Sequence, residues 1–485
     1  MTSDLTQLEP RLVWEHFLEL TRIPRPPKQE ESARAHIVAW AGERGFASNV
    51  DAAGNVVIQV PASSGRESAQ TVVLQAHLDM VCERDPSSTY DPREGRISVV
   101  RDGDWVLAEG TTLGADNGIG VAGAMAAADD PEIAHGPLEL LFTVSEEQGL
   151  DGAKALDPAL VSGRILLNLD GTSDAGITIG CAGSAHTFAR LPLEAAPVPA
   201  SDLTLEVRLS GFRGGHSGGD IASGRVNAIK ALGRVLSRAR DEVSFRIVSL
   251  EGGVSRNAIP REAAAVVTLR PAAEAAFRDS ADAEVAALRQ QYSASDGGAK
   301  VEVEQRGPAA AAAVYATTSR ALDLVAATPT GVIAMSSGLT GVVETSTSLN
   351  VASTEGGVLT LASMTRSAND EALEDLLTTI QAAARLAGAE VELLRSYPPW
   401  RPDLESRLLA TARDTYSRLF DSEPKLEVVH GGLECAVIGG KLHGVEMISI
   451  GPNIEGPHAP GERLGISSTQ RFYRLLGGIL EDLSR

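Results

Sequence analysis

The chain has 485 residues, with 43 lysines and arginines against 64 aspartates and glutamates, so its formal net charge is −21. This balance excludes a strongly basic nucleic-acid-binding protein as the default interpretation. Hydrophobic residues make up 43% of the chain and charged residues 22%, which is typical of a globular protein and argues against disorder. At about 100 to 200 residues per domain, the length predicts two or three domains.

The chain contains three cysteines, Cys82, Cys181 and Cys435, which are too few and too scattered for a disulfide framework or a Cys-x-x-Cys metal site. The N-terminal segment lacks the basic and apolar regions of a secretory signal, and no apolar run approaches the length of a membrane span. We therefore expect a cytoplasmic protein in a reducing compartment, without nucleic-acid or membrane partners.

The first predicted elements are two amphipathic helices between residues 8 and 44, separated by the proline-rich segment TRIPRPPKQE. Short, almost continuously apolar runs follow at residues 55–60, 71–76, 138–144 and 164–169. Such runs are typical of strands that are buried on both faces of a parallel or mixed sheet covered by helices. Between the second and third runs, the small-residue segment 117–128 predicts a helix that packs tightly against this sheet.

The pattern changes beyond about residue 185 to the alternation of half-buried strands. The runs LTLEVRLSGF, SFRIVSLEGG and REAAAVVTLR are strand-like, and the helical segment RVNAIKALGRVLSRA lies between the first two. This β-α-β-β order predicts a separate α+β domain. A second stretch of this kind contains a TEGG hairpin turn and ends in the helical segment NDEALEDLLTTIQAAARLAGAE.

The proline-rich segment 397–402 marks a domain boundary. After it, helical and buried apolar strand patterns like those of the first part of the chain return. We predict an α/β protein with one discontinuous domain, formed by residues 1–185 and 397–485 around a helix-covered mixed sheet. Residues 186–396 form the inserted α+β domain.

Ionisable residues follow four core-type strands of the discontinuous domain, namely the runs at residues 71–76, 138–144 and 164–169 and the buried-looking run VEMISI at residues 445–450. The strands run into His77 and Asp79, into Glu146 and Glu147, into Asp170, and into the loop that carries His458. Ligands bind at the carboxyl edge of open α/β sheets, so these groups could converge in space. Asp116, in the glycine-rich loop GTTLGADNGIG, adds another carboxylate.

Two histidines and several carboxylates, without cysteine, match a hydrolytic site for zinc, manganese or cobalt better than a thiolate-rich structural zinc site. Because side chains alternate along a strand, His77 and Asp79 point to the same side, so Asp79 could orient the imidazole. Each such residue alone is more often an ordinary core or surface group. Four strand ends with buried like charges, however, need compensating cations.

A series of motifs stands in order along the chain: AHLDMV, GTTLGADNGIGVA, SEEQGLDGA, NLDG, GGHSGGDI, RNAIPRE, GVVETS, HGGLEC and GPNIEGPHAP. In these motifs the sequence resembles the aminoacyl-histidine dipeptidases, also called Xaa-His or carnosine-type dipeptidases, of the dinuclear-zinc aminoacylase and carboxypeptidase-G clan. The resemblance implies a discontinuous catalytic domain with an inserted lid. It also implies metal-dependent hydrolysis of Xaa-His and related dipeptides by a metal-bridging water that a glutamate activates.

The resemblance implies roles for the residues at the strand ends. Two divalent ions, zinc or else manganese or cobalt, would be held by His77, Asp116, Glu147, Asp170 and His458. His77 and Asp170 would belong to opposite metals, and Asp116 would bridge them. Glu146 would be the general base, and Asp79 would orient His77.

The resemblance also assigns residues of the inserted domain. His216 would stabilise the tetrahedral oxyanion, and Asn257 and Arg366 would hold the terminal carboxylate of a small peptide substrate. A homodimer is expected, and His216 could act in its own subunit or in a partner. In the motif HGGLEC, Glu434 could serve in packing or contact the substrate's amino group. Departures such as Ala436 after that motif leave the substrate side-chain preference open.

Two motifs offer other interpretations. The segment 215–219 satisfies the GxSxG pattern of a serine hydrolase, which would leave the ionisable strand ends unexplained. The segment 118–123 satisfies the GxGxxG pattern of a dinucleotide site, but the upstream carboxylate of Asp116 would repel a pyrophosphate, so we favour tight helix packing.

Other activities within the clan remain open, namely an N-acyl amino acid amidohydrolase or a tripeptide aminopeptidase with the same metal core. A catalytically inactive binding protein is the alternative from a different class. The presence of Glu146 and of every expected ligand argues against it.

Overall fold

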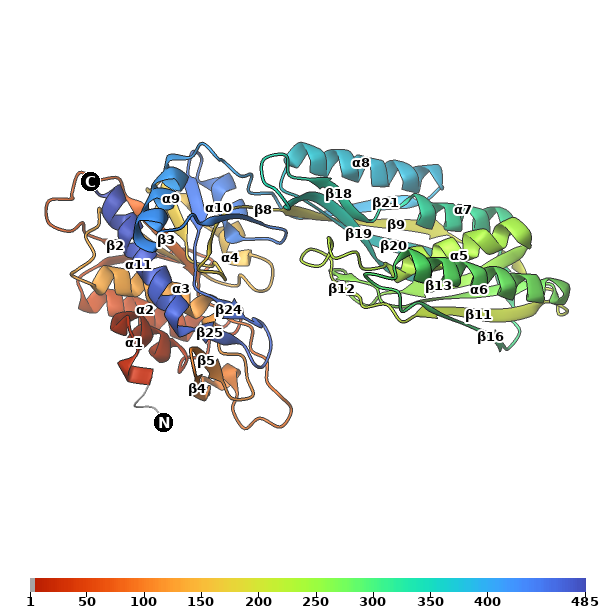
Figure 1. Ribbon diagram of the computed structural model, residues 1–485, viewed down its shortest axis with the longest axis horizontal. Helices are drawn as coiled ribbons and strands as arrows, with labels where there is room; N and C mark the ends of the chain where they lie inside the picture. Colours follow the sequence, from red (N-terminus) through yellow and green to blue (C-terminus); the bar gives the residue numbers. More distant parts are fainter. Residues whose placement is uncertain (1–4) are drawn as a thin grey trace. The chain divides into compact units, whose positions relative to one another are not determined.

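The computed structural model describes residues 5–485, and residues 1–4, with which the first predicted domain opens, lie outside the described part. The chain divides into two compact units. Unit 1 comprises Met1–Cys181, Trp400–Val429 and Leu433–Arg485, and unit 2 comprises Ala182–Pro399 and His430–Gly432. Figure 1 follows unit 1 through the red and orange start of the chain and its blue end, and unit 2 through the green and teal segments between them.

Unit 1 is built on a mixed sheet that has eight strands within the described residues, in the order β1-β2-β6-β3-β7-β23-β8-β22. In that order the strands are β1 (Ala47–Val50), β2 (Val56–Val60), β6 (Leu138–Thr143), β3 (Val72–His77), β7 (Ile165–Asn168), β23 (Glu446–Ser449), β8 (Gly176–Cys181) and β22 (Lys425–Val429). The four central strands β6, β3, β7 and β23 run parallel to one another. Every residue of β3 and β6 is buried, which confirms the strands predicted from continuous apolar runs.

Helices cover this sheet, as predicted. They are α1 (Arg11–Leu20), α2 (Glu31–Glu43), α3 (Ala115–Asp129), α4 (Asp151–Ala155), α9 (Arg407–Phe420), α10 (Glu434–Lys441) and α11 (Ile466–Leu483), with 3-10 turns η1 (Leu5–Gln7), η2 (Pro92–Glu94) and η3 (Pro158–Leu160). Helix α3 packs on β3, α2 on β1 and β2, and α9 on β23, whereas α1 and α11 contact α3. A small sheet in the order β24 (Ile454–Glu455), β25 (Arg463–Gly465), β5 (Trp105–Ala108) and β4 (Val99–Asp102) completes unit 1.

The glycines of the segment 118–123 serve helix packing. A Cβ atom at Gly120 would lie 2.5 Å from the carbonyl oxygen of Leu169, and one at Gly123 would lie 3.0 Å from the ring of Phe472. Helix α3 therefore approaches its neighbours more closely than any larger residue would allow. The GxGxxG pattern is explained by this packing, as we favoured from the sequence.

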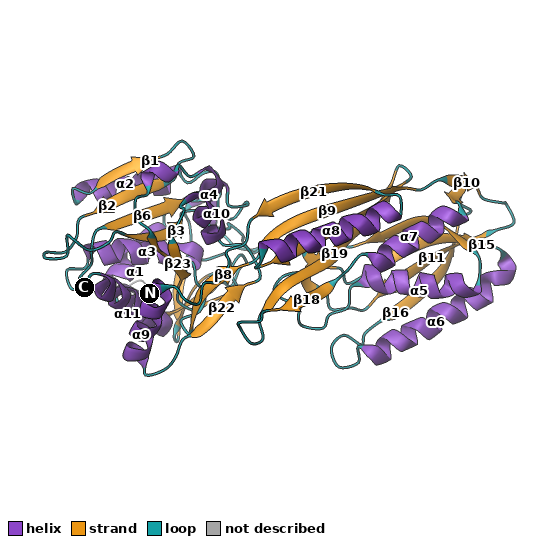
Figure 2. Ribbon diagram, turned by 90° about the horizontal axis from the view of Figure 1, so that it is seen from above, coloured by secondary structure: helices purple, strands orange, loops and turns teal. Residues whose placement is uncertain are grey.

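Unit 2 contains a second sheet, whose strands pair antiparallel in the order β16-β11-β15-β13-β19-β20-β9-β21, with β18 also paired to β19. In that order they are β16 (Lys300–Arg306), β11 (Leu203–Ser210), β15 (Ala263–Leu269), β13 (Phe245–Gly252), β19 (Val343–Glu355), β20 (Val358–Ser367), β9 (Gly183–Pro192), β21 (Glu390–Tyr397) and β18 (Gly331–Met335). The helices are α5 (Ala228–Glu242), α6 (Glu274–Gln291), α7 (Tyr315–Ala327) and α8 (Asp370–Leu386), with the 3-10 turn η4 (Pro271–Ala273). Figure 2 shows these helices along the sheet.

Two short pairs, β10 (Ala195–Pro197) with β17 (Ala311–Ala313) and β12 (Gly215–His216) with β14 (Ala258–Ile259), complete unit 2. The order β11-α5-β13-β15 confirms the predicted β-α-β-β segment.

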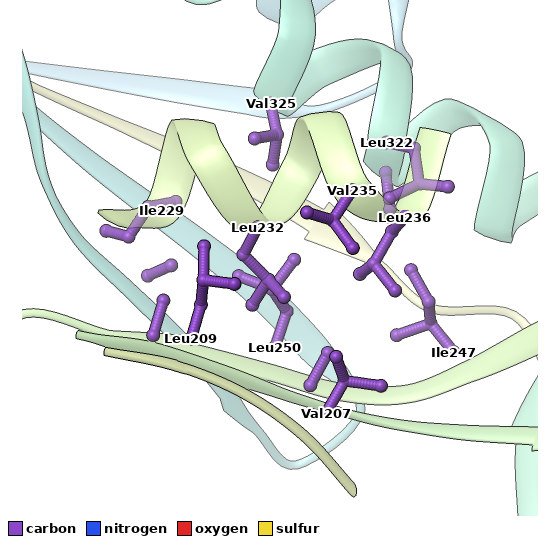
Figure 3. Packing of buried hydrophobic residues seen from close by; sticks show 14 of the residues in the cluster. Val207, Leu209, Ile229, Leu232, Val235, Leu236, Ile247, Leu250, Leu322 and Val325 are labelled. Atoms are coloured by element: carbon purple, nitrogen blue, oxygen red, sulfur yellow. The ribbon is translucent and has the colours of Figure 1, made fainter. Parts of the chain in front are cut away.

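The core of unit 2 lies between α5 and the sheet. Figure 3 shows apolar side chains of α5 directed toward those of β11 and β13 and toward α7. Leu232 and Leu236 of α5 are fully buried in this cluster, as are Leu209 of β11 and Leu250 of β13. Each such side chain stabilises the fold by roughly 1.5–3 kcal/mol relative to full exposure.

The helices between residues 5 and 485 include none that is long and apolar enough to cross a membrane. The three cysteines are buried and unpaired, in agreement with the absence of a disulfide framework.

Candidate metal centre and substrate-binding cluster

The parallel strands of unit 1 bring the predicted ligands to one edge of the sheet. His77 is the last residue of β3, which lies between β6 and β7. Glu146 and Glu147 follow β6, Asp170 follows β7, and His458 lies in the loop between β24 and β25. Because parallel strands end at the same edge, residues that are far apart in the sequence meet there.

Two groups of ligand-type atoms share the carboxylate of Asp116. In the first group, Nε2 of His77 lies 3.0 Å from Oδ1 of Asp116 and 3.7 Å from a carboxylate oxygen of Asp170. In the second, Nε2 of His458 lies 3.2 Å from Oδ2 of Asp116 and 3.2 Å from Oε2 of Glu147. Each oxygen of Asp116 thus faces a different group.

The grouping corrects one expectation. The resemblance implied that His77 and Asp170 belong to opposite metals, but the two side chains lie in the same group. The reason is the strand order, since β3 and β7 are hydrogen-bonded neighbours in parallel register. Residues at their carboxyl ends are therefore adjacent.

Asp79 is fully buried and fixes two parts of the site. Its carboxylate lies 3.4 Å from Nδ1 of His77, and its two oxygens accept hydrogen bonds of 3.0 Å from the backbone N–H groups of Glu146 and Glu147. Burial alone would raise the pKa of Asp79, but the hydrogen bond and charge of His77, with these two N–H groups, hold that pKa below its ordinary value. Asp79 is therefore ionised at neutral pH.

The site carries an excess of negative charge. Burial, followed by the nearby Asp170, Glu434 and Glu147, raises the pKa of Glu146 well above its ordinary value, although His77 opposes the shift. Hydrogen bonds with Asp116 and Glu147, opposed by burial, raise the pKa of His458 to about 11. The raised pKa values mean that the negative charge of the site favours the protonated forms of these side chains. Bound cations would stabilise the same negative charge.

The donor set fits divalent metal ions. Each group offers one imidazole nitrogen and carboxylate oxygens, which are ligands that zinc, manganese and cobalt accept. Among residues 5–485, Oε1 of Glu147 is buried and has no hydrogen-bond partner. That oxygen is available to a bound cation.

Glu434, whose role the sequence left open, lies buried at the start of α10 in a polar network. Its Oε2 accepts hydrogen bonds of 2.6 Å from Nε2 of Gln75 and from the hydroxyl of Thr143. Gln75 in turn accepts a 2.6 Å hydrogen bond from Asn168. Burial raises the pKa of Glu434 to about 7, although the charge of His77 opposes the shift.

His216 of unit 2 is held in one tautomer. Its Nδ1 accepts hydrogen bonds from the backbone N–H groups of Gly219, at 3.0 Å, and Gly218, at 3.3 Å. Burial and the charge of Arg366 lower the pKa of His216, so the neutral ring carries its proton on Nε2. That N–H is a hydrogen-bond donor.

Arg366 of β20 and His430 lie in the same unit 2 cluster as His216. A Cβ atom at Gly218 would lie 2.5 Å from the backbone oxygen of His430 and 3.3 Å from Nε of Arg366, so only glycine fits. Within the described residues, Nε of Arg366 and Nδ1 of His430 are buried without hydrogen-bond partners. Burial, with the charges of Arg366 and His216, lowers the pKa of His430 to about 4.

His430 was not singled out from the sequence. Its motif HGGLEC was noticed, but nothing local distinguished this histidine from a surface one. Nε2 of His430 lies 2.7 Å from the hydroxyl oxygen of Ser346. Ser346 belongs to β19, which is far from His430 in the sequence.

Asn257 lies beside this cluster at the turn before β14. Its backbone oxygen accepts a 2.8 Å hydrogen bond from the N–H of Ser217, and its Oδ1 accepts one of 2.6 Å from Ser255. The side chain of Ser217, the nucleophile of the GxSxG interpretation, is buried against the sulfur of Met364. This environment does not present Ser217 as a nucleophile.

Comparisons with known proteins agree with the fold. The model of peptidase family M20/M25/M40 matches residues 73–482. The chain is 37% identical over 481 residues to the cytosol non-specific dipeptidase of Escherichia coli, covering 99% of each chain. The crystal structure of aminoacylhistidine dipeptidase from Vibrio alginolyticus is similar with a TM-score of 0.91 and 36% identity, covering 99% of each chain. Aminopeptidase PepT from Bacillus cereus shares the fold at a TM-score of 0.58 and 17% identity, with 99% of this chain and 100% of that chain covered.

Proposed function

We propose a mechanism for this chain from one premise, that the chain belongs to peptidase family M20/M25/M40. It is a peptide hydrolase, and it hydrolyses dipeptides. We propose that its substrates include Xaa-His dipeptides within a broader range. One relative is named for aminoacylhistidine substrates and another as non-specific, and these names support that range.

The chain would hold two divalent metal ions, zinc or else manganese or cobalt. The observation that carries this proposal is the carboxylate of Asp116, whose two oxygens face two separate ligand groups. His77 and Asp170 would join Asp116 at one ion, and Glu147 and His458 at the other. When bound, the ions would supply positive charge that polarises the scissile carbonyl and favours ionisation of the attacking water.

Glu146 would act as the general base. A carboxylate oxygen of Glu146 lies within 4.8 Å of ligand-type atoms of His77 and Glu147, which belong to different groups, and neither group that contains Asp116 includes Glu146. Its carboxylate would take a proton from the attacking water and later return that proton to the leaving amine. Asp79 would keep the His77 ring in one orientation, because its backbone oxygen and its carboxylate lie at Nδ1, so that Nε2 faces Asp116 and Asp170.

Unit 2 would act as the lid and bind the substrate. The Nε2–H of His216 would donate to the oxyanion of the tetrahedral intermediate. Arg366, with its buried Nε lacking a partner among the described residues, would bind the terminal carboxylate together with Asn257. We also propose a cytoplasmic location, which the name of the E. coli relative supports, and a homodimer, which light scattering after size-exclusion chromatography would test.

A hydrolysis screen tests the proposed function. The metal-supplemented protein is incubated with Xaa-His dipeptides, other dipeptides, tripeptides and N-acyl amino acids, and E146Q serves as the matched blank. We expect turnover of dipeptides, with Xaa-His among them, and loss of that turnover in E146Q. Preferential turnover of tripeptides or of N-acyl amino acids would overturn the assignment in favour of another activity of the clan.

A further inference from the structure

Glu462 accepts hydrogen bonds from four consecutive backbone N–H groups. Its Oε2 binds Leu113 and Gly114, at 2.8 and 2.9 Å, and its Oε1 binds Ala115 and Asp116, at 2.8 and 3.2 Å. The side chain of Glu462 is buried, with only 2% of the residue exposed. More than 340 residues separate it from this loop, so the contact is made by the tertiary fold.

The local geometry explains why the loop needs such a partner. Gly114 has a left-handed conformation, and Asp116 and Asn117 depart from helical geometry, so regular α3 begins only after them. The N–H groups ahead of a helix have no partner within it. A single carboxylate can accept several of them and is favoured at a helix start by its charge.

Arg25 binds the same loop through one carbonyl group and links it to the segment after β3. Its guanidinium donates to the carbonyl oxygen of Gly114 at 2.6 Å, and to those of Leu78 and Asp79 at 2.9 and 3.1 Å. A Cβ atom at Gly114 would lie 2.6 Å from this guanidinium. The loop is therefore bound by an anion at its N–H groups and by a cation at the carbonyl group of Gly114.

Glu462 also belongs to the loop that carries His458. The loop runs between β24 and β25, and His458 has a left-handed backbone and a side chain that is 51% exposed. Burial of the imidazole therefore contributes little to holding this segment in position. The buried carboxylate of Glu462 joins it to the loop of Asp116.

We propose that Glu462 is a positioning residue that sets the placement of His458 relative to Asp116, and thereby the affinity of the metal site formed by Asp116, Glu147 and His458. This inference rests on the proposed function. Both oxygens of Glu462 are already occupied by N–H groups, so it acts through the two ligands and not as a ligand. The other site depends less on Glu462, because His77 and Asp170 are carried by adjacent strands.

The test is a metal titration of chelator-treated protein with Zn²⁺, in wild type and E462Q. Glutamine keeps the size of the side chain, but its NH₂ group would face backbone N–H groups. The control is E455Q on the same hairpin, where Glu455 is exposed and pairs with Arg463. In E462Q we expect the affinity of one site for Zn²⁺ to fall at least about tenfold and that of the other to fall clearly less, whereas both affinities of E455Q match those of wild type.

Activity provides a second readout. In E462Q, kcat/KM should be low at limiting Zn²⁺ and recover toward wild type at saturating Zn²⁺, because Glu462 does not contact the substrate. A purely structural role would lower the Tm but leave both affinities unchanged, and that result would overturn the proposal. Equal weakening of both sites in folded protein would also overturn it.

One outcome separates this proposal from the proposed function. If wild type fails to bind two divalent ions, the proposed function fails, whatever the variant does. If E462Q does not fold, E462D keeps the charge but shortens the side chain. The same selective loss is then expected, and two unchanged affinities in E462D would overturn the positioning role.

Discussion

Oδ2 of Asp116 lies 3.2 Å from Nε2 of His458, although 342 residues separate them in the sequence. The other oxygen of Asp116 faces His77. Asp116 is thus the side chain common to both ligand groups, and the two groups should lose affinity together when it is changed.

The substitution D116N should therefore remove both metal ions. The amide keeps the size of the side chain but replaces one anionic oxygen with an NH₂ group, which cannot act as a ligand. We expect wild type to retain about two divalent ions per chain after desalting and D116N to retain fewer than one, as measured by elemental mass spectrometry. The control is D102N, since Asp102 is exposed on β4. Retention of two ions by D116N would contradict the shared role.

The substitution E146Q should abolish turnover without removing metal. The loss of a positioned general base typically costs about 10²- to 10⁴-fold in rate, and glutamine preserves the shape of the site. The matched variant is E147Q in the adjacent residue, which should lose metal as well as activity because Glu147 faces His458. Steady-state kinetics and metal content should be measured on both variants. Substantial kcat in E146Q would show that another group is the base.

The substitution D79N should weaken metal binding. The side chain of asparagine has only one oxygen, so its NH₂ group would face either the N–H of Glu147 or both His77 and the N–H of Glu146. Changes in groups that orient a metal ligand typically cost about 10- to 100-fold in metal affinity or activity. Calorimetric titration of the chelator-treated protein with Zn²⁺ measures the affinity. Wild-type affinity and activity in D79N would leave Asp79 without an orienting role.

The substitution R366K should raise KM for substrates with a free terminal carboxylate. Lysine keeps the positive charge but loses the planar fork that binds a carboxylate through two bonds. Hydrogen bonds to charged groups contribute about 1.5–3 kcal/mol, which corresponds to a rise in KM of roughly ten- to hundredfold. Dipeptide amides are the matched substrates, and their KM should change little. A similar rise for both substrate types would point to a general disturbance of unit 2.

The stability of metal-free protein should depend on pH through Glu434. Burial raises its pKa in the folded state to about 7, from an ordinary value of 4.5. Between these two pH values the folded state holds a proton that the unfolded state releases, so the free energy of unfolding should fall as the pH rises from 4.5 through 7. The full shift corresponds to about 3 kcal/mol.

Urea unfolding of chelator-treated wild type and E434Q, at pH 5 and pH 8, measures this contribution. The variant should lose less stability between the two pH values than wild type does, because glutamine does not titrate. Identical losses in the two proteins would mean that the proton on Glu434 is not linked to folding.

The sequence by itself determined which strands carry the chemistry. Continuous apolar runs identify strands buried on both faces, and the residues that follow them are ionisable. His77, Glu146, Glu147 and Asp170 could be singled out for this reason, since both signals are local. Their convergence followed from one general property, that parallel strands end at a common edge.

Only the tertiary structure decided how these residues are grouped and supported. His77 is grouped with Asp170 because β3 and β7 are neighbours in the sheet. The residues of neither strand specify which strand lies beside it. Glu462 and Arg25 look like ordinary polar residues in the sequence, and the role of Glu434 stayed open there, yet each is buried against groups from distant segments. The physical reason is that burial and long-range hydrogen bonds arise only when the chain has folded, whereas apolar periodicity acts within each segment.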